Sequence, residues 1–340
     1  MKRLFIIMLI LVPIKIRAIS ISARSAILMD TDSNRILYEK YINEVRSVAS
    51  ISKIMTAIIA IESGKMKNEV TVGKEIEKSY GSGIYLTIGE KLKLEDLVYG
   101  LMLRSGNDAA LAIAKYVGGS VDKFVDLMNK KANEIGMKNT TFNNPSGLDQ
   151  EKGNYSTAYD MAKLTSYAVK NKEYRKITGT KKYTLKTNKN VYNWINKNKL
   201  LKKYKYTTGG KTGFTEKARR TLVTTATKNN TNLVVVTLND GNDWQDHQNL
   251  FEYGFNNYKT IKILKKGAIK IYNEMFYKNY LLYIKHNFSY AMSNNEKEGI
   301  IVKYQLNKVR NIKNKMKIGT ALVYLGDSKI HEETIYIKER

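Results

Sequence analysis

The chain contains no cysteine and only two prolines among its 340 residues. The absence of cysteine excludes a disulfide scaffold, a thiolate metal site and a cysteine nucleophile. The three histidines, at positions 247, 286 and 331, are too far apart to suggest a histidine-rich metal cluster. Acidic residues are also scarce, because 31 Asp and Glu stand against 58 Lys and Arg and leave a formal net charge of +27.

Two readings of this charge stay open. A strongly basic protein is suited to a polyanion, such as an anionic wall polymer or a membrane surface. The other reading is drift in composition, since the lysines are spread from end to end of a chain rich in Lys, Asn, Ile and Tyr. Hydrophobic residues make up 43% of the chain, which is a foldable composition, and the length allows one full core and a smaller second one.

The N-terminus predicts export. Residues 1–3 form a short basic start, residues 4–14 are apolar apart from Pro13, and the small residue Ala18 follows two further cations. This pattern is typical of a secretory signal peptide over residues 1–18, either cleaved or kept as an anchor. We therefore expect an extracytoplasmic protein, secreted or associated with the outer face of the cell membrane or wall, and no nucleic-acid partner.

The periodicity of apolar residues divides the remaining chain into two regions. Helical spacing is found at residues 50–63, 94–103, 108–117, 121–135, 157–171 and 244–258, and strand-like segments at 25–30, 35–39, 182–187, 209–215, 221–227 and 233–238. Helices between two sets of antiparallel strands predict an α+β fold. After residue 262, short alternating segments at 268–272, 280–284, 299–304, 321–325 and 335–337 predict a small β domain. We place the domains at residues 19–260 and 261–340.

The first of three short motifs is Ser50-Ile51-Ser52-Lys53, at the start of a predicted apolar helix. Three residues are just under one helical turn, so the hydroxyl and the amine share a face. A serine needs an adjacent base to become a nucleophile, and a lysine can be that base only if its pKa is lowered. The alternative is a serine that caps a helix, which is our interpretation of the equally spaced Ser120 and Lys123.

The second motif is Ser105-Gly106-Asn107, between two predicted helices. A serine in a loop can relay a proton, and an asparagine amide can hold a substrate carbonyl. The alternative is a polar turn, and Ser293-Asn294-Asn295 has the same pattern in a polar loop of the second region.

The third motif is Lys211-Thr212-Gly213, in a strand rich in small residues. Glycine in a strand often marks close approach by a ligand or another backbone. Lys211 and Thr212 offer a cation and a hydroxyl to a substrate carboxylate, and Phe214 offers a backbone N–H to an oxyanion. The alternative is a glycine-rich bulge with an exposed lysine.

Taken together, the three motifs occur in the order found in penicillin-binding proteins and serine β-lactamases. The chain over about residues 25–258 resembles the low-molecular-mass D-alanyl-D-alanine carboxypeptidases, and the sporulation-associated branch is the one we suspect. The resemblance rests on the segments 48–56, 100–110, 144–149, 155–162 and 210–217. The tail resembles the small β domain that many of these enzymes carry.

This resemblance implies a penicillin-binding-protein or β-lactamase-like transpeptidase fold and a serine DD-peptidase that removes the terminal D-alanine of peptidoglycan stem peptides. It implies covalent inhibition by β-lactams and no metal or cofactor. The residues that it points to are Ser50, Lys53 and Ser105 as the catalytic set, and Asn107, Lys211, Thr212, Gly213 and Phe214 as the substrate-binding set. One departure is Asn154, which stands where relatives often have histidine.

Other functions were weighed against this one. A class A β-lactamase needs a glutamate base in a Glu-x-x-Leu-Asn pattern, which the sequence does not contain. A catalytically weak wall-binding or penicillin-binding protein remains an alternative, although the intact Ser50 and Lys53 argue against it. A Ser-His-Asp hydrolase using His247 is disfavoured because no G-x-S-x-G motif contains Ser50.

Overall fold

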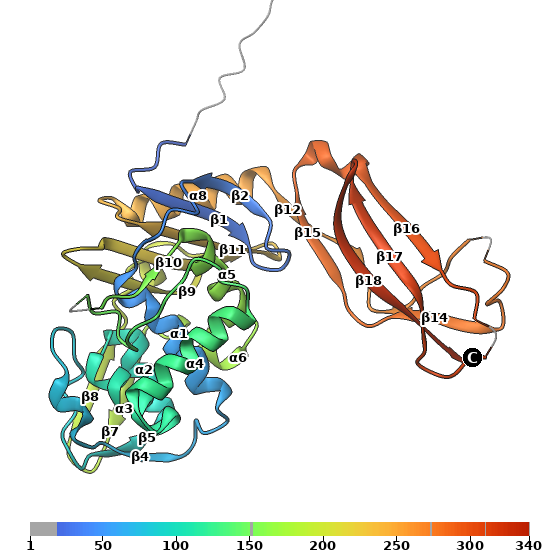
Figure 1. Cartoon of the computed structure of the whole chain (residues 1–340). Coiled ribbons are helices and arrows are strands. Elements are labelled where there is room, and N and C mark those ends of the chain that lie inside the picture. Colours follow the sequence, from blue (N-terminus) through green and yellow to red (C-terminus); the bar gives the residue numbers. More distant parts are fainter. Residues whose placement is uncertain (1–18, 150–151, 273, 310, 340) are drawn as a thin grey trace, which may run out of the picture.

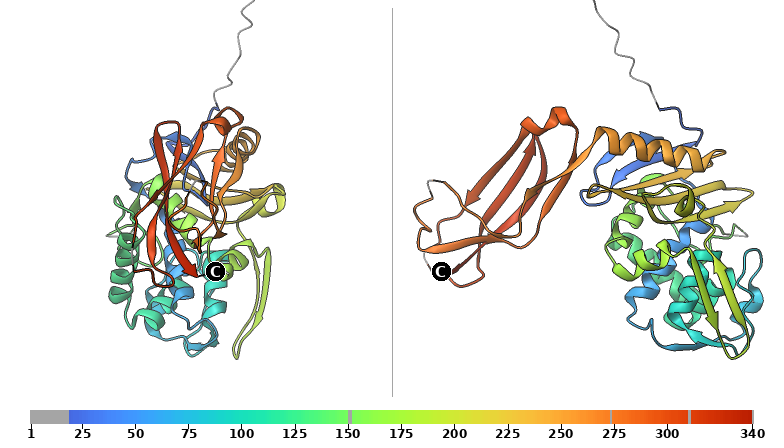
Figure 2. Two further views of the ribbon diagram at one scale, coloured as in Figure 1. Left: turned by 90° about the vertical axis from the view of Figure 1, so that its right-hand side faces the viewer. Right: turned by 180° about the vertical axis from the view of Figure 1, so that it is seen from behind.

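The fold was derived from a computed structural model of the chain (Figure 1). It describes residues 19–149, 152–272, 274–309 and 311–339. The predicted signal peptide over residues 1–18 lies outside these described residues. Figure 2 shows two bodies side by side, one with helices around a sheet and the other built from strands.

The first body is organised by a five-stranded antiparallel sheet of order β2-β1-β11-β10-β9. Its strands are β1 (Ser25–Asp30), β2 (Ile36–Lys40), β9 (Thr207–Thr215), β10 (Arg219–Lys228) and β11 (Thr231–Leu238). The central strand β11 carries the run Leu233 to Leu238, every residue of which is buried. Such a continuous apolar run fits a strand with both faces covered.

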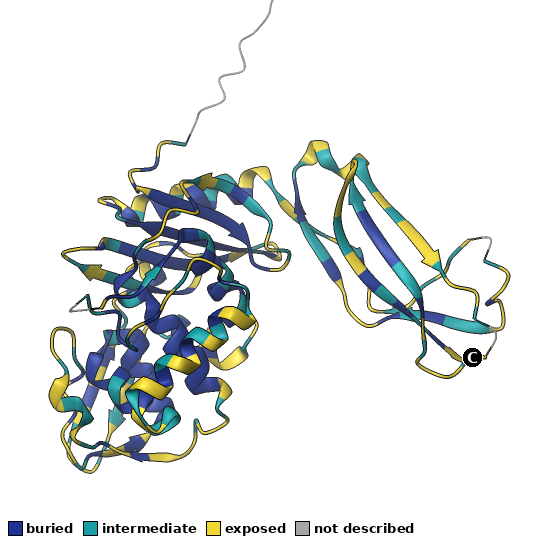
Figure 3. Cartoon of the chain, in the orientation of Figure 1, coloured by how far each residue is buried: buried dark blue, intermediate teal, exposed yellow. Residues whose placement is uncertain are grey.

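Helices cover the two faces of this sheet. They are α1 (Lys53–Glu62), α2 (Leu94–Arg104), α3 (Asn107–Gly118), α4 (Val121–Glu134), α5 (Ala158–Ala168), α6 (Lys172–Gly179), α7 (Leu200–Lys203) and α8 (Asp243–Asn257). Leu250 and Phe251 of α8 pack with Leu28 and Val235 on one face of the sheet. Leu200 of α7 belongs to the same cluster. The remaining helices form a larger cluster on the opposite face, which Figure 3 shows as the most extensively buried part of the molecule.

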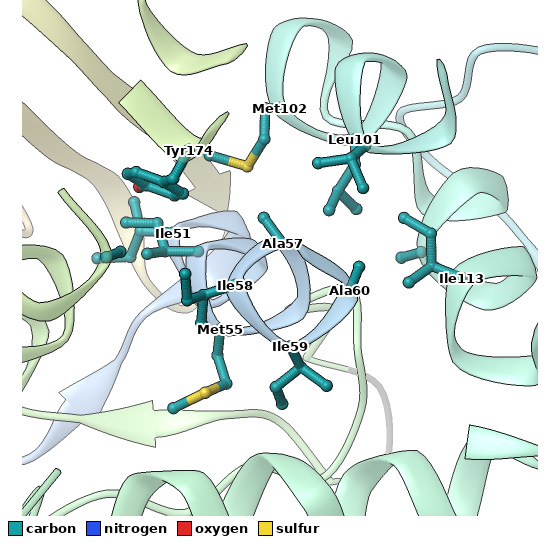
Figure 4. Packing of buried hydrophobic residues seen from close by; sticks show 14 of the residues in the cluster. Ile51, Met55, Ala57, Ile58, Ile59, Ala60, Leu101, Met102, Ile113 and Tyr174 are labelled. Atoms are coloured by element: carbon teal, nitrogen blue, oxygen red, sulfur yellow. The ribbon is translucent and has the colours of Figure 1, made fainter. Parts of the chain in front are cut away.

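Helix α1 runs through the middle of this cluster. All its residues from Lys53 to Ile61 are buried, which explains why its sequence is apolar on every side. Figure 4 shows Met55, Ile58 and Ile59 of α1 pointing into the surrounding core, with Leu101 of α2 and Ile113 of α3 nearby. A lysine at the first position of such a helix is therefore held away from water.

Short elements complete the first body. They are the 3₁₀ helices η1 (Ala49–Ser52) and η2 (Lys74–Lys78), and the strand pairs β3 (Arg46–Ser47) with β6 (Tyr155–Ser156), β4 (Glu69–Thr71) with β5 (Lys91–Lys93), and β7 (Lys182–Lys186) with β8 (Val191–Ile195). The predicted helix over 50–63 is thus divided between η1 and α1. The predicted helix over 157–171 ends at Ala168, and α6 follows because Asn171 caps a new helix by accepting from the N–H groups of Glu173 and Tyr174.

The second body has its own core between two antiparallel sheets. One sheet pairs β12 (Lys259–Leu264) with β15 (Phe288–Met292), and the other has the order β13 (Gly267–Ala268), β14 (Tyr280–Ile284), β18 (Ser328–Glu339), β17 (Lys317–Leu325) and β16 (Ile300–Leu306), with the 3₁₀ helix η3 (Asn294–Gly299) before β16. Leu264, Ile284, Ile318, Val323 and Ile335 are among its buried residues.

One predicted strand of this body is wrong beyond its first residue. The segment 268–272 leaves the sheet after Ala268, and Tyr272 is exposed. The cause lies in the partner strand, because the chain before Tyr280 folds into a turn held by the buried Tyr277. Residues 270–272 therefore have no strand beside them with which to pair.

Arg35 joins the two bodies. Its Nη1 donates to the backbone oxygen of Ala291 at 2.6 Å and to Oε2 of Glu296 at 2.9 Å. The guanidinium also lies 4.9 Å from the centroid of the Tyr290 ring and 5.4 Å from that of Tyr258. The hydrogen bonds from Arg35 lower the pKa of Glu296 to about 2. This pair therefore stays ionised well into the acid range.

We expect Arg35→Ala to lower the free energy of unfolding by about 1–3 kcal/mol, because it removes charge-assisted hydrogen bonds between partly buried groups. Urea unfolding of the two proteins measures this loss. Arg24→Ala is the matched control, because Arg24 is exposed and its substitution should change stability by less than about 0.5 kcal/mol. Equal midpoints for the two variants would contradict a joining role for Arg35.

Candidate active site

Ser50 and Lys53 meet at the start of α1. Ser50 lies in η1, and the Lys53 Nζ is 3.1 Å from the Ser50 Oγ. Ala49, directly before the serine, has a φ of +49° in the left-handed region, which costs energy for a residue with a Cβ. The hydroxyl of Thr221 on β10 donates to the Val48 backbone oxygen at 3.1 Å and fixes this segment against the sheet. The local backbone is therefore held in one conformation around the serine.

Lys53 is held by two carbonyl oxygens as well as by the serine. Its Nζ donates to Oδ1 of Asn107 at 2.6 Å and to the backbone oxygen of Ser146. A neutral amine has two N–H donors and one lone pair. With the two donors used by Asn107 and Ser146, the lone pair of a neutral Lys53 faces the hydroxyl of Ser50.

The environment favours the neutral form of this amine. Burial lowers the pKa of Lys53 to about 7, and the positive charge of Lys197 adds to the effect. The carboxylate of Asp108 raises the pKa of Lys53. It makes its hydrogen bonds elsewhere, because it accepts from the backbone N–H groups of Ile84 and Leu86. A lysine in this position can take a proton from a hydroxyl near neutral pH.

A second serine and a second lysine lie opposite the first pair. Ser105 follows α2 with a φ of +66°, and the Nζ of Lys211 donates to its Oγ at 3.0 Å. The same Nζ donates to the backbone oxygen of Thr212 at 2.7 Å. Burial, followed by the charges of Lys53 and Lys197, lowers the pKa of Lys211 well below its ordinary value. A charge on Lys53 therefore disfavours a charge on Lys211.

Gly213 allows β9 to lie against the backbone of the serine. A Cβ at this position would stand 3.0 Å from the Ser50 nitrogen and 2.4 Å from the Thr221 Oγ1. Only a residue without a side chain fits this approach. Phe214, the next residue, is 61% exposed, so its ring faces solvent at the rim.

These groups surround a cleft of about 430 Å³. Its lining includes Ser50, Ser105, Thr212, Gly213 and Phe214, together with Lys197 and Trp244. Lys53 and Lys211 lie behind the lining, each one hydrogen bond from a serine of the cleft. Asn107 lines a neighbouring cavity of about 430 Å³ with Tyr80 and Ser146. The structure therefore brings all eight predicted site residues together.

The repeated motifs occupy structural positions, as the sequence predicted. The Ser120 Oγ caps α4 by accepting from the Lys123 N–H at 3.1 Å. Ser293 precedes η3 in the second body. His247 is fully buried between the hydroxyls of Thr224 and Thr237, and burial lowers its pKa to about 3. It is a neutral core residue that does not lie in the cleft.

The sequence did not predict a role in the site for three groups, which are the Ser146 backbone oxygen, Asn154 and Lys197. The backbone oxygen of Ser146 contacts Lys53, and its loop is braced by Asn154, whose Oδ1 accepts from the N–H of Asn143 at 2.7 Å. Asn154 thus has a structural task at the position where histidine was expected. Lys197 donates to the Ser82 Oγ at 3.2 Å and supplies the cation near Lys53. Only the similarity of segment 144–149 to relatives pointed towards this loop.

Comparison with known proteins agrees with this geometry. The family model described as D-alanyl-D-alanine carboxypeptidase matches residues 13–242. The chain belongs to the D-alanyl-D-alanine carboxypeptidase family. A second model, described as the C-terminal domain of penicillin-binding protein 5, matches residues 258–340. The predicted transpeptidase-like fold with a small β-rich C-terminal part is confirmed.

Individual members of the D-alanyl-D-alanine carboxypeptidase family are similar over most of the chain. DacF of Bacillus subtilis is 36% identical over 72% of this chain, and DacC of Escherichia coli is 35% identical over 74%. The alignments span 65% and 66% of those two proteins, so slightly less than two thirds of each is covered. The crystal structure of penicillin-binding protein 5 from Haemophilus influenzae has a TM-score of 0.79 at 28% identity, covering 95% of this chain and 98% of that one.

Within the described part of the chain, no helix has both the length and the apolar character needed to cross a membrane.

We expect Gly147→Ala to lower the free energy of unfolding of the protein far more than Gly119→Ala does. Both glycines have a φ near +80°, so both substitutions carry the same backbone strain, about 1–2 kcal/mol. A Cβ at Gly147 would also stand 2.0 Å from the Ala49 backbone oxygen, whereas nothing lies within 4 Å of one at Gly119. Urea unfolding of both variants isolates the steric contact, and equal losses would show that the 143–147 loop is not packed against η1.

Proposed function

We propose that the protein is a serine D-Ala-D-Ala carboxypeptidase that removes the terminal D-alanine from peptidoglycan stem peptides. The proposal rests above all on the buried Lys53 amine, 3.1 Å from the Ser50 Oγ and with two carbonyl acceptors for its protons. Membership of the family and the order of the three motifs support it.

The proposed reaction begins at Ser50. Lys53 takes the hydroxyl proton while the Ser50 Oγ attacks the carbonyl carbon of the penultimate D-alanine. Ser105, which accepts from Lys211, relays to the departing D-alanine nitrogen the proton that Lys53 took from Ser50, so that both side chains end in their starting forms. Water then releases the acyl group from Ser50. No metal or cofactor takes part in this scheme.

The remaining residues of the set hold the substrate. Lys211 and Thr212 bind the terminal carboxylate through N–H and O–H donors, and Asn107 orients the peptide. The backbone N–H groups of Ser50 and Phe214 stabilise the oxyanion of the tetrahedral intermediate. Gly213 supports this arrangement, because it lets the β9 backbone lie close to the Ser50 nitrogen.

The same site accounts for covalent binding of β-lactams. The strained amide of a penicillin would acylate Ser50, and the missing Glu-x-x-Leu-Asn base argues for slow release. This distinguishes the proposed enzyme from a β-lactamase, which would turn penicillin over. A wall-binding protein without activity is disfavoured because the buried amine and its serine are both in place.

We also propose how the chain is organised and where it works. Residues 19–260 would form the serine DD-peptidase domain and residues 261–340 a C-terminal domain that positions it. The signal-like pattern of residues 1–18 and the net charge of +27 support export to an anionic wall or membrane surface. The sporulation-associated branch also stays a prediction.

We expect Ser50→Ala to reduce labelling by fluorescent penicillin at least about 1000-fold, because the acylated oxygen is removed. Release of D-alanine from a peptide ending in D-Ala-D-Ala should fall in parallel. Ser120→Ala is the matched control, since it alters the second S-x-x-K motif and should leave both signals unchanged.

Three results would decide between the functions. Label that persists in Ser50→Ala would place the nucleophile elsewhere. Continued consumption of penicillin beyond one equivalent would indicate a β-lactamase. Labelling of the unaltered protein without any release of D-alanine would indicate a binding protein.

The rate of penicillin labelling should depend on pH through Lys53. Acylation needs the neutral amine, and burial sets the pKa of Lys53 at about 7. The rate should therefore rise about tenfold per pH unit below 7 and level off above about 8.

Lys197→Gln removes a positive charge that lowers the pKa of Lys53, so the midpoint of the pH profile should move to higher pH. Lys199→Gln is the control, because Lys199 lines the same cleft. Equal midpoints for the two variants would show that the charge of Lys197 does not lower the pKa of Lys53.

A further inference from the structure

Two long loops meet at one end of the C-terminal sheet. The β13–β14 loop covers residues 269–279 and the β16–β17 loop covers residues 307–316, of which Asn273 and Arg310 lie outside the described residues. The buried Tyr277 joins the loops, because its hydroxyl contacts the Asn307 backbone oxygen and accepts from the Val309 N–H at 3.1 Å. We call the described residues of these loops the distal tip, since Figures 1 and 2 show them at the end remote from the first body.

The distal tip exposes large apolar side chains. Tyr272 is 83% exposed, Met275 71% and Phe276 45%. Met275 and Phe276 lie in a turn in which Glu274 accepts from the Phe276 N–H at 2.8 Å and Lys278 donates its N–H to the Met275 backbone oxygen. A fixed turn that holds apolar groups in water marks a surface with a partner.

Exposed lysines lie in the same two loops and at the adjoining strand ends. The two loops and the adjoining ends of β17 and β18 carry Lys270, Lys278, Lys308, Lys313, Lys315, Lys317 and Lys338, all of them exposed. Strand register places them together, because Lys338 pairs with Leu281 at the start of β14 and the Lys315 N–H donates to the Ile337 backbone oxygen. The acids described at this end are Glu274, which is used in the turn, and Glu339. This end of the C-terminal sheet thus combines exposed apolar side chains with many lysines.

We propose that the distal tip inserts Tyr272, Met275 and Phe276 into the surface of an anionic lipid bilayer. Aromatic side chains are favoured at the boundary between headgroups and acyl chains, and lysine can place its stem along apolar surface with its ammonium among the lipid phosphates. The contact places the C-terminal body between the bilayer and the cleft at Ser50.

Other partners fit this surface less well. The interface of a protein partner is depleted in lysine, so the seven exposed lysines at this end of the sheet argue against one. A soluble phosphate polymer would attract the lysines but leaves Tyr272, Met275 and Phe276 in water. A bilayer that contains anionic lipid satisfies both groups at once.

A tryptophan reporter in the full chain tests insertion directly. Phe276→Trp should give an emission that shifts to the blue with vesicles of equal parts phosphatidylglycerol and phosphatidylcholine, and that is quenched by brominated acyl chains. Tyr85→Trp is the matched control, because Tyr85 is 82% exposed on the first body. The emission of Trp194 and Trp244, measured on the unaltered protein, is subtracted from both.

Charge reversal tests the lysines in the same assay. Lys313→Glu with Lys315→Glu should weaken vesicle binding at least tenfold, since each lysine near an anionic surface contributes about fivefold. Lys297→Glu with Lys303→Glu changes two exposed lysines of the same body outside the tip and should weaken it much less. Thermal unfolding of all four reporter and charge variants shows whether the fold is kept.

Three outcomes would overturn the proposal. The first is sedimentation of the unaltered protein with vesicles while the Phe276→Trp emission stays unchanged, which would place the lipid contact elsewhere. The second is binding to poly(glycerol phosphate) without binding to vesicles, which would identify a polymer site. The third is equal weakening by the two charge reversals, which would reduce the effect to net charge.

Discussion

The half of the molecule that holds the cleft is built around an amine that has no access to water. Burying an ionised ammonium costs several kcal/mol unless it is paired, and the polar groups that contact Lys53 are a hydroxyl and two carbonyl oxygens. The neutral form is therefore the one that the site accommodates. That single constraint requires the surrounding fold to supply uncharged acceptors in fixed places.

Each part of the surrounding fold serves this requirement. The apolar α1 excludes water from Lys53, the loop braced by Asn154 presents the Ser146 oxygen, and the first residue of α3 presents the Asn107 amide. The sheet contributes on the opposite side, where Lys211 reaches Ser105. A serine–lysine pair thus occurs twice, as Ser50 of η1 with Lys53 of α1 and as Ser105 after α2 with Lys211 of β9. The cleft lies between the two pairs.

Much of this could be predicted because side-chain chemistry at fixed spacing is visible in a sequence. The three-residue separation of Ser50 and Lys53 indicated a shared helical face, and the glycine of the third motif indicated close backbone approach. The Ser146 oxygen could not be found in this way, since every residue has a backbone carbonyl and only the fold chooses one. Lys197 is one lysine among many, and its distinction comes from its place in the lining of the cleft, where its charge acts on Lys53. In the second body, the alternation of apolar residues at 268–272 could not reveal that the neighbouring strand β14 begins only at Tyr280, after a turn.

The two glycines on either side of Ser50 limit how the cleft can change. Gly213 approaches the Ser50 nitrogen from the strand, and Gly147 approaches the Ala49 carbonyl from the loop. Because neither position has room for a methyl group, the space around Ser50 cannot be narrowed by enlarging these residues. The shape of the cleft can change instead at its rim, where Phe214 and Trp244 belong to the lining.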